Sequence, residues 1–151
     1  MFYILILLIV IFDQLIKVVI QSNFVPGQSI PVINNIFHLT YVRNIGAGFG
    51  ILAGRRSFFI ILTVLILIFL MIYRYKMSSN IYSDIAIALI IGGAIGNLID
   101  RVRLRYVVDY LDFRIWPVFN LADSAVSVGA VILMIYIWNQ KEDGQGDNTN
   151  V

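Results

Sequence analysis

Four apolar stretches of bilayer-spanning length constrain the fold of this chain more than any other feature of its sequence. They cover roughly residues 2–20, 57–73, 81–99 and 120–138, and a helix needs about 20 apolar residues to cross the hydrocarbon core of a membrane. Only 13% of the 151 residues are charged, whereas a soluble domain carries about 25%. Because backbone groups inside a bilayer must bond to one another, the stretches predict helices. The sequence therefore predicts a membrane protein, mainly α, with a bundle of four transmembrane helices.

The segments outside the four spans predict a small sheet and a loose tail. Residues 24–54 contain the run Phe37–Val42, which is rich in aromatic and β-branched residues and predicts a strand. We expect this segment to form a small β-sheet at the membrane surface. Residues 1–138 then form a single membrane-embedded domain, and the polar residues 139–151 form a disordered tail. The first span lacks a cleavage-site pattern, so we interpret it as a retained helix and not as a signal peptide.

The polar residues of the spans fall at one end of the predicted bundle. With four spans, the end of the first, the end of the third and the start of the fourth all lie on the same side of the membrane. The polar residues in these positions are Asp13, Gln14 and Lys17 in the first span, Asn97 and Asp100 in the third, and Asn120 and Asp123 in the fourth. Ionisable groups at membrane depth are costly and indicate a functional site.

Simple structural roles account for part of this pattern. Asp13 and Lys17 are spaced i, i+4 on one helix and can neutralise each other. Asn120 precedes the fourth span and suits the N-cap of that helix. Neither role explains Asp123, which lies about a turn further into the span. Asp109, in the connection before the fourth span, would ordinarily be a solvated loop residue.

Several kinds of chemistry are excluded by the residues available. The chain has no Cys and one His, so thiol catalysis and a zinc–thiolate site are excluded, and no metal-ligand spacing is present. A net charge of +2 without a basic stripe argues against a nucleic-acid partner. What remains is carboxylates, and two neighbouring carboxylates share a proton and supply one acid and one base. The pattern suits an aspartyl hydrolase, while a proton-coupled transporter and a non-catalytic scaffold are alternatives.

Five motifs in order resemble those of one peptidase family. They are Asp13–Lys17, Asn44–Phe49, Gly92–Arg101, Val107–Tyr110 and Phe119–Ser124. Each motif alone is weak, but Gly-Gly-x-x-Gly-Asn-x-x-Asp-Arg together with Phe-Asn-x-Ala-Asp is highly specific. The sequence therefore resembles the lipoprotein signal peptidase (signal peptidase II) family, and the resemblance covers nearly the whole chain.

The resemblance implies an aspartic endopeptidase that removes signal peptides from prolipoproteins by cutting before the diacylglyceryl-modified Cys. It implies Asp109 and Asp123 as the catalytic pair, with no cofactor and no metal. The partners are then lipid-modified substrates and membrane lipids, and we expect a monomer. The resemblance also assigns residues that bind substrate or support the pair, namely Asn44, Asn97, Arg101 and Asn120, with Asp13, Lys17 and Asp100 in supporting positions.

The resemblance and the charge distribution disagree about orientation. Members of the family are multi-pass proteins of the bacterial cytoplasmic (inner) membrane, with both termini in the cytoplasm and the site and sheet near the extracytoplasmic face. Eight Lys or Arg residues fall on the polar side of this chain and three on the other, and the positive-inside rule would place the polar side in the cytoplasm. We expect the orientation of the family, because several of the arginines have roles in the site or at lipid headgroups.

Overall fold

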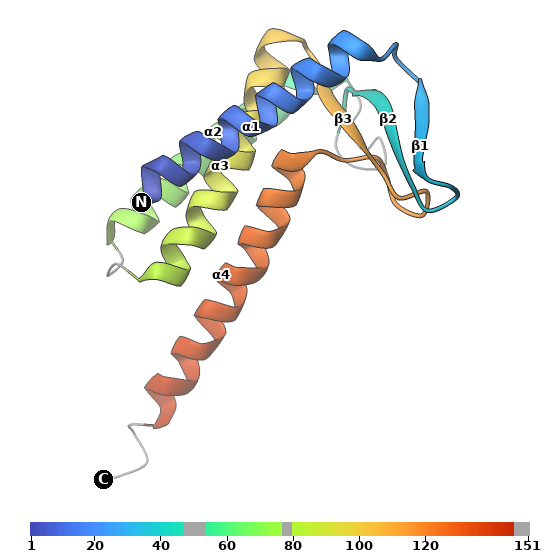
Figure 1. The fold of residues 1–151 in the computed structure, drawn as a ribbon. Helices are drawn as coiled ribbons and strands as arrows, with labels where there is room; N and C mark the ends of the chain where they lie inside the picture. The colour runs from blue at the N-terminus through green and yellow to red at the C-terminus, as the bar shows by residue number, and fades with distance from the viewer. Residues whose placement is uncertain (47–53, 77–79, 147–151) are drawn as a thin grey trace.

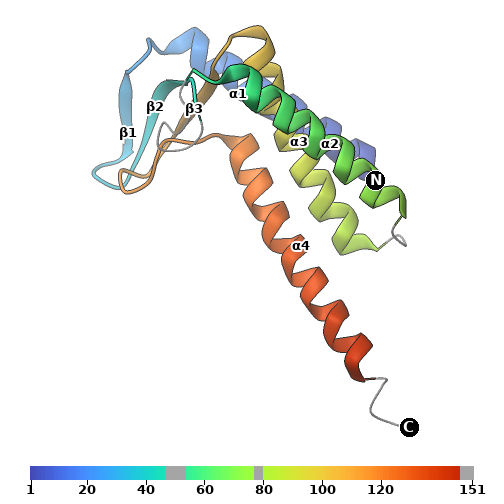
Figure 2. The ribbon, with the colours of Figure 1, turned by 180° about the vertical axis from the view of Figure 1, so that it is seen from behind.

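Four long helices form the body of the protein. The computed structural model describes residues 1–46, 54–76 and 80–146. The helices are α1 (Phe2–Asn23), α2 (Arg56–Lys76), α3 (Ile81–Arg103) and α4 (Leu121–Gly146). Each of the four contains a segment long and apolar enough to cross a membrane, which confirms the predicted spans. The start of α1 and the far end of α4 lie at the end of the bundle opposite the sheet (Figures 1 and 2).

All four helices extend beyond their predicted ends, and in α1 local side-chain contacts support the extension. The last turn of α1 contains Gln21, Ser22 and Asn23, whose side chains donate hydrogen bonds to the carbonyls four residues earlier, at 3.2, 2.8 and 2.7 Å. These carbonyls belong to Lys17, Val18 and Val19, so the bonds reinforce the last turn beside its backbone hydrogen bonds. Helix α4 continues to Gly146, past the predicted end at Trp138, so the segment predicted as a disordered tail begins as helix. The remainder of that tail lies outside the described residues.

A three-stranded antiparallel sheet lies at one end of the bundle. Its strands are β1 (Ser29–Ile33), β2 (Phe37–Asn44) and β3 (Val107–Asp112), in the order β1-β2-β3. The first two occupy the predicted region between α1 and α2. The third comes from the connection between α3 and α4, which corrects the prediction of a sheet confined to the first connection. Figures 1 and 2 show the sheet where α1 and α3 end and α4 begins.

An apolar cluster fixes the sheet to the bundle. Ile20 of α1 packs against Tyr41 of β2 and against Val108 and Tyr110 of β3, and all four are at most 4% exposed. Burial of this apolar surface stabilises the docked arrangement. Strand β3 is thereby held between β2 and the helices, and its residues are almost all buried.

Helices α3 and α4 approach each other closely at glycines. A Cβ atom added at Gly93 would collide with the backbone carbonyl of Ala122 on α4, and one at Gly129 would lie 2.6 Å from the carbonyl of Ala86 on α3. A small residue at such a position allows two helix backbones to approach, as is common in membrane bundles. The glycines therefore set the distance between the two helices that carry Asn97 and Asp123.

We expect Gly93→Ala to destabilise the protein by about 1–3 kcal/mol or more, because the backbone of α4 must move to admit the methyl group. Thermal melting of the purified variant in detergent measures the loss. Ala130→Val is the control, since Ala130 is exposed on α4 and the added methyl groups enter lipid or detergent. Equal melting temperatures of Gly93→Ala and the wild type would contradict the close packing.

Candidate active site

Asp109 is a buried carboxylate on the central part of β3. Its side chain is 1% exposed, although a lone Asp in a connection is ordinarily solvated. The carboxylate accepts hydrogen bonds from Asn44 Nδ2 at 2.8 Å and from Asn120 Nδ2 at 2.7 Å. Asn44 ends the neighbouring strand β2, where Val42 pairs with Asp109 across the ladder. The pairing of β2 with β3 therefore brings Asn44 to the carboxylate.

Asp123 lies in the first turn of α4 and forms a reciprocal cap with Asn120. Asn120 Oδ1 accepts from the Asp123 amide at 2.9 Å, and Asp123 Oδ2 accepts from the Asn120 amide at 3.2 Å. This is the geometry of a capping box, so the predicted capping role of Asn120 is confirmed. The other oxygen, Oδ1, accepts from Asn97 Nδ2 at 2.7 Å. Asn120 thus bonds to both Asp109 and Asp123.

The two carboxylates line one cavity. It has a volume of about 380 Å³ and is also lined by Asn44, Arg101 and Phe59. Arg101 lies over the ring of Phe59 on α2, with its guanidinium carbon 5.2 Å from the ring centre. A cation over an aromatic face is held there electrostatically. The cavity therefore combines two carboxylates, the amide of Asn44, the guanidinium group of Arg101 and an apolar wall.

A second cavity meets the first at Asp123. It has a volume of about 540 Å³ and runs along α4 beside Ser127 and Val128. Trp116 and Phe119 line both cavities together with Asp123. Neither aromatic residue was predicted as a site residue, although Phe119 begins the motif Phe119–Ser124. The second cavity is mainly apolar and, because it shares these lining residues, forms an arm beside the first.

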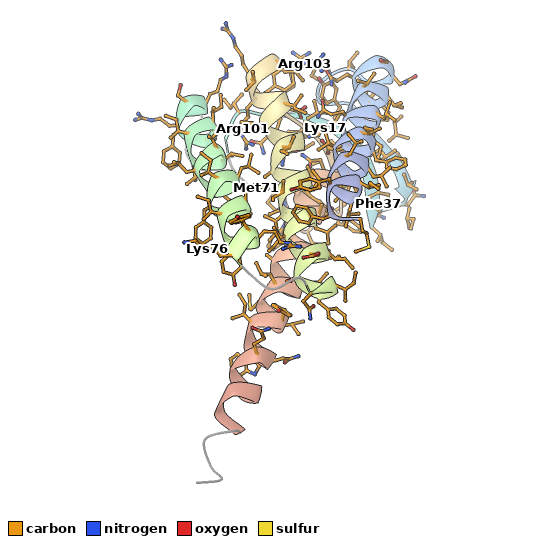
Figure 3. The ribbon with its side chains drawn as sticks, turned by 90° about the vertical axis from the view of Figure 1, so that its left-hand side faces the viewer. Lys17, Phe37, Met71, Lys76, Arg101 and Arg103 are labelled. Atoms are coloured by element: carbon orange, nitrogen blue, oxygen red, sulfur yellow. The ribbon has the colours of Figure 1, made fainter. Side chains whose placement is uncertain are left out.

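A buried lysine joins the first helix to the site. Lys17 Nζ lies 2.9 Å from Asp13 Oδ2, 2.8 Å from Asp100 Oδ2 and 2.9 Å from Asn97 Oδ1. Lys17, Asp13 and Asp100 are at most 2% exposed. The predicted pair of Asp13 and Lys17 is present, but it is part of a larger cluster. Figure 3 shows Lys17 on the side of α1 that faces α3.

The carboxylates of this cluster also bind backbone amides of the site elements. Asp13 Oδ1 accepts from the Ala122 amide in the first turn of α4 at 3.1 Å, and Asp100 Oδ2 accepts from the Val108 amide of β3 at 3.1 Å. Gln14, for which the sequence predicts no specific role, donates to Asp100 Oδ1 at 3.0 Å. The cluster therefore ties α1 to the two elements that carry Asp109 and Asp123.

Known proteins similar to this chain share its length and its fold. The sequence profile described as signal peptidase (SPase) II matches residues 5–139. The chain belongs to the signal peptidase II family. It is 54% identical to the lipoprotein signal peptidase of Halothermothrix orenii over 95% of this chain and 99% of that one. It is 53% identical to that of Moorella thermoacetica over 87% of this chain and 89% of that one.

Solved structures support the same assignment. A bacterial membrane enzyme solved by the in meso method at 2.3 Å resolution superposes with a TM-score of 0.90 and 37% identity, over 94% of this chain and 90% of that one. A second, solved at 1.9 Å, gives a TM-score of 0.83 and 38% identity, over 90% and 91%. The chain is therefore a multi-pass membrane peptidase of the signal peptidase II family, and the transporter and scaffold alternatives are not supported.

The environment of Asp109 in this signal peptidase II family member favours its protonated form. Asp109 lies outside the membrane-spanning helices. Burial, followed by the negative charge of Asp123, raises the pKa of Asp109 to about 7, against the smaller opposing effects of the hydrogen bonds from Asn44 and Asn120. Desolvation and a like charge both disfavour an ionised carboxylate. At neutral pH Asp109 is therefore poised between acid and base.

Asp112, on the same strand, belongs to a different environment. It accepts from Thr40 Oγ1 at 2.7 Å, and from the Arg114 amide and side chain at 2.9 and 3.0 Å. Burial opposes ionisation, but these hydrogen bonds outweigh it and hold the pKa of Asp112 below its ordinary value. Alternation along the strand predicts that Asp109 and Asp112 face opposite sides, and their separate partners agree with it.

The residues that the structure describes give no indication of a metal centre. No group of three or more His, Cys, Asp or Glu side chains in residues 1–46, 54–76 and 80–140 could hold a metal ion. The Gly-rich stretch that follows Asn44 lies partly outside these ranges. Within them, Gly46 donates its amide to Asn44 Oδ1 at 2.9 Å, which fixes the amide group of Asn44 with its Nδ2 toward Asp109.

Proposed function

We propose that this protein is an aspartic peptidase that removes signal peptides from prolipoproteins, with Asp109 and Asp123 as its catalytic pair. The observation that carries the proposal is that both carboxylates line one cavity and are both bonded to Asn120. The bond cut is the peptide bond before the diacylglyceryl-modified Cys. The relatives' name, lipoprotein signal peptidase, supports this choice of substrate.

Asp123 acts as the base in this proposal. Its two oxygens accept from Asn97 Nδ2 and from a backbone amide at the N-terminus of α4. Hydrogen-bond donors and the positive end of a helix dipole both stabilise a carboxylate. Asp109, with a pKa of about 7, carries a proton in about half of the molecules at pH 7 and acts as the acid in that form.

The two groups then hydrolyse the peptide bond without a covalent enzyme intermediate. Asp123 takes a proton from a water molecule whose oxygen bonds to the scissile carbonyl carbon, while Asp109 gives its proton to the carbonyl oxygen. The diol so formed collapses as the carbon–nitrogen bond breaks. The leaving nitrogen receives the proton held by Asp123, and Asp109 recovers a proton from the diol as the carboxylic acid forms.

The cavities suit a lipid-modified peptide. Asn44 and Arg101 offer polar groups in the cavity of the pair, where they can bind the substrate backbone. The arm beside Ser127 and Val128 is mainly apolar and can take the acyl chains. Trp116 lines both spaces and separates the two parts of the substrate.

Lys17 and Asn97 position the base. Because an ammonium group only donates hydrogen bonds, the contact of Lys17 with Asn97 Oδ1 at 2.9 Å fixes the amide with its Nδ2 toward Asp123. Asn120 Nδ2 donates to the same oxygen at 3.1 Å. Asp13 and Asp100 support this arrangement by holding Lys17.

We also propose that the sheet end faces the outside of the bacterial cytoplasmic membrane and that both termini are in the cytoplasm. The site then meets substrates whose modified Cys has reached the outer surface. All proposed catalytic and positioning groups come from one chain, so a monomer is sufficient for activity.

The test is a cleavage assay with the purified protein and a synthetic precursor, offered with and without the diacylglyceryl group on its Cys. We expect cleavage of the lipidated precursor alone, with the new amino terminus at the modified Cys, as read by mass spectrometry. No cleavage of the lipidated precursor, or equal cleavage of both precursors, would contradict the proposed substrate.

The rate should also fall as the pH rises through about 7, because Asp109 loses the proton that it must donate. A profile of kcat/KM against pH measures this alkaline limb. Asn44→Ala removes a donor that stabilises the ionised form of Asp109, so its alkaline limb should move to higher pH, whatever its effect on the rate. A limb that stays in place or moves to lower pH would contradict the assignment of Asp109 as the acid.

A further inference from the structure

A third cavity lies between the ends of α1 and α3, away from the catalytic pair. It has a volume of about 180 Å³, and its lining includes Arg103, Gln21, Ser22, Val18 and Lys17. None of its lining residues lines either cavity at Asp123. Arg101 and Arg103 are two positions apart on α3, so they point to nearly opposite sides of the helix. Figure 3 shows Arg101 toward α2 and Arg103 toward α1.

Arg103 is the available cation of this cavity. It is exposed, and within the part of the chain that the structure describes no hydrogen bond or ion pair joins its side chain to another residue. Arg101, in contrast, lies over Phe59. Lys17 cannot serve instead, because its ammonium already contacts Asp13, Asp100 and Asn97. The cavity therefore offers a guanidinium group, three uncharged polar side chains (Gln14, Gln21 and Ser22) and no carboxylate in its lining.

The surface around the cavity is positively charged. Exposed cations at the sheet end of the described chain are Arg43, Arg55, Arg103, Arg105 and Arg114. The carboxylates at the same end are buried or half-buried, namely Asp13, Asp100, Asp109, Asp112 and Asp123. The exposed surface at this end is therefore positively charged, and such a surface attracts anions.

The cavity lies where two helices of membrane-spanning length end. Arg103 is the last residue of α3, and Gln21 and Ser22 are in the last turn of α1, where membrane-spanning helices leave the hydrocarbon core. Below them, Val18 and Leu15 are 53% and 56% exposed on α1. An apolar strip therefore leads from the cavity into the bilayer.

We propose that this cavity binds the phosphate of an anionic glycerophospholipid from the adjacent leaflet. Arg103 donates to the phosphate oxygens, for which a guanidinium group has matching geometry, and Gln21 and Ser22 line the headgroup. One acyl chain lies along Val18 and Leu15. Phosphates paired in this way neutralise arginines at the sheet end, which would explain why that end carries more positive charge than the positive-inside rule allows for an outer surface.

The test measures binding of dioleoylphosphatidylglycerol to the full-length protein in detergent by native mass spectrometry. We expect Arg103→Gln to weaken binding about tenfold, since a charge-assisted hydrogen bond is lost. Lys76→Gln is the matched control, because Lys76 is an exposed cation at the other end of the bundle, and its affinity should equal that of the wild type. A melting curve without lipid confirms that Arg103→Gln is folded.

Two further ligands distinguish a phosphate that belongs to a lipid from a phosphate in a soluble molecule. Glycerol 3-phosphate carries the phosphate without chains, and dioleoylglycerol carries the chains without the phosphate. Both should bind more weakly than the phospholipid, and dioleoylglycerol, which has no phosphate, should show no dependence on Arg103. The proposal is overturned if Arg103→Gln binds the phospholipid as tightly as the wild type, or if glycerol 3-phosphate binds equally well in an Arg103-dependent manner.

Discussion

Asp109→Asn and Asp123→Asn are each expected to slow cleavage of a lipidated precursor by about 10²–10⁴-fold, the usual loss when a general acid or base is removed. Asn has nearly the volume of Asp but can neither give nor take the proton. The loss can exceed this range because the two groups act in one step. Both variants should insert in the membrane and bind substrate, since Asn44, Asn97 and Asn120 remain in place.

The control for this prediction lies on the same strand. Asp112→Asn changes a carboxylate that is also buried but bonds to Thr40 and Arg114. Asp112 does not line the cavity of the catalytic pair, so this variant should retain most of the rate. Asp100→Asn should lower stability yet leave measurable turnover. The measurement is kcat/KM for the purified variants after a melting curve confirms folding. Near-wild-type turnover in either Asp109→Asn or Asp123→Asn would overturn the assignment.

Lys17→Met is expected to lower the free energy of unfolding by about 3–5 kcal/mol, because it leaves buried charges without a partner. Asp13 and Asp100 are 0% and 2% exposed and both contact the ammonium. The loss should extend to activity, because Asn97 is no longer held with its amide toward Asp123. Chemical or thermal unfolding in detergent measures the effect on stability.

Two comparisons test the cause of this loss. Adding Asp13→Asn and Asp100→Asn to Lys17→Met removes the unpaired charges and should restore part of the stability. Arg74→Met breaks a pair with Asp84 at 2.7 Å whose members are 23% and 13% exposed, so it should cost less. If Lys17→Met lowers the free energy of unfolding no more than Arg74→Met does, the buried cluster around Lys17 does not stabilise the site as proposed.

The spans could be predicted from the sequence, but their ends and the third strand could not. Length and apolar composition determine which segments cross a bilayer. The end of α1 depends on side chains such as Ser22 and Asn23 that bond back to carbonyls. Strand β3 forms by pairing with β2, far away in the sequence, and a local pattern carries no information about such a partner.

The candidate site was predicted largely through its resemblance to a family, and the structure adds the contacts. Chain parity explains why Asp13, Asn97 and Asp123 meet at one end. It does not show that Lys17 contacts two carboxylates at once, or that Trp116 lines the space beside Asp123, because both follow from packing in three dimensions. The opposite directions of Arg101 and Arg103 could have been read from helical periodicity.

An infrared titration of the carboxyl groups tests the central claim, that Asp109 and Asp123 share one proton as a coupled pair. In the wild type, the carbonyl stretch of one protonated carboxyl should disappear as the pH rises through about 7, the pKa of Asp109. Asp109→Asn should abolish this transition. Asp123→Asn should move it to lower pH, because the like charge that raises the pKa of Asp109 is gone. A transition near pH 7 that persists in Asp109→Asn, or that is unchanged in Asp123→Asn, would contradict the account.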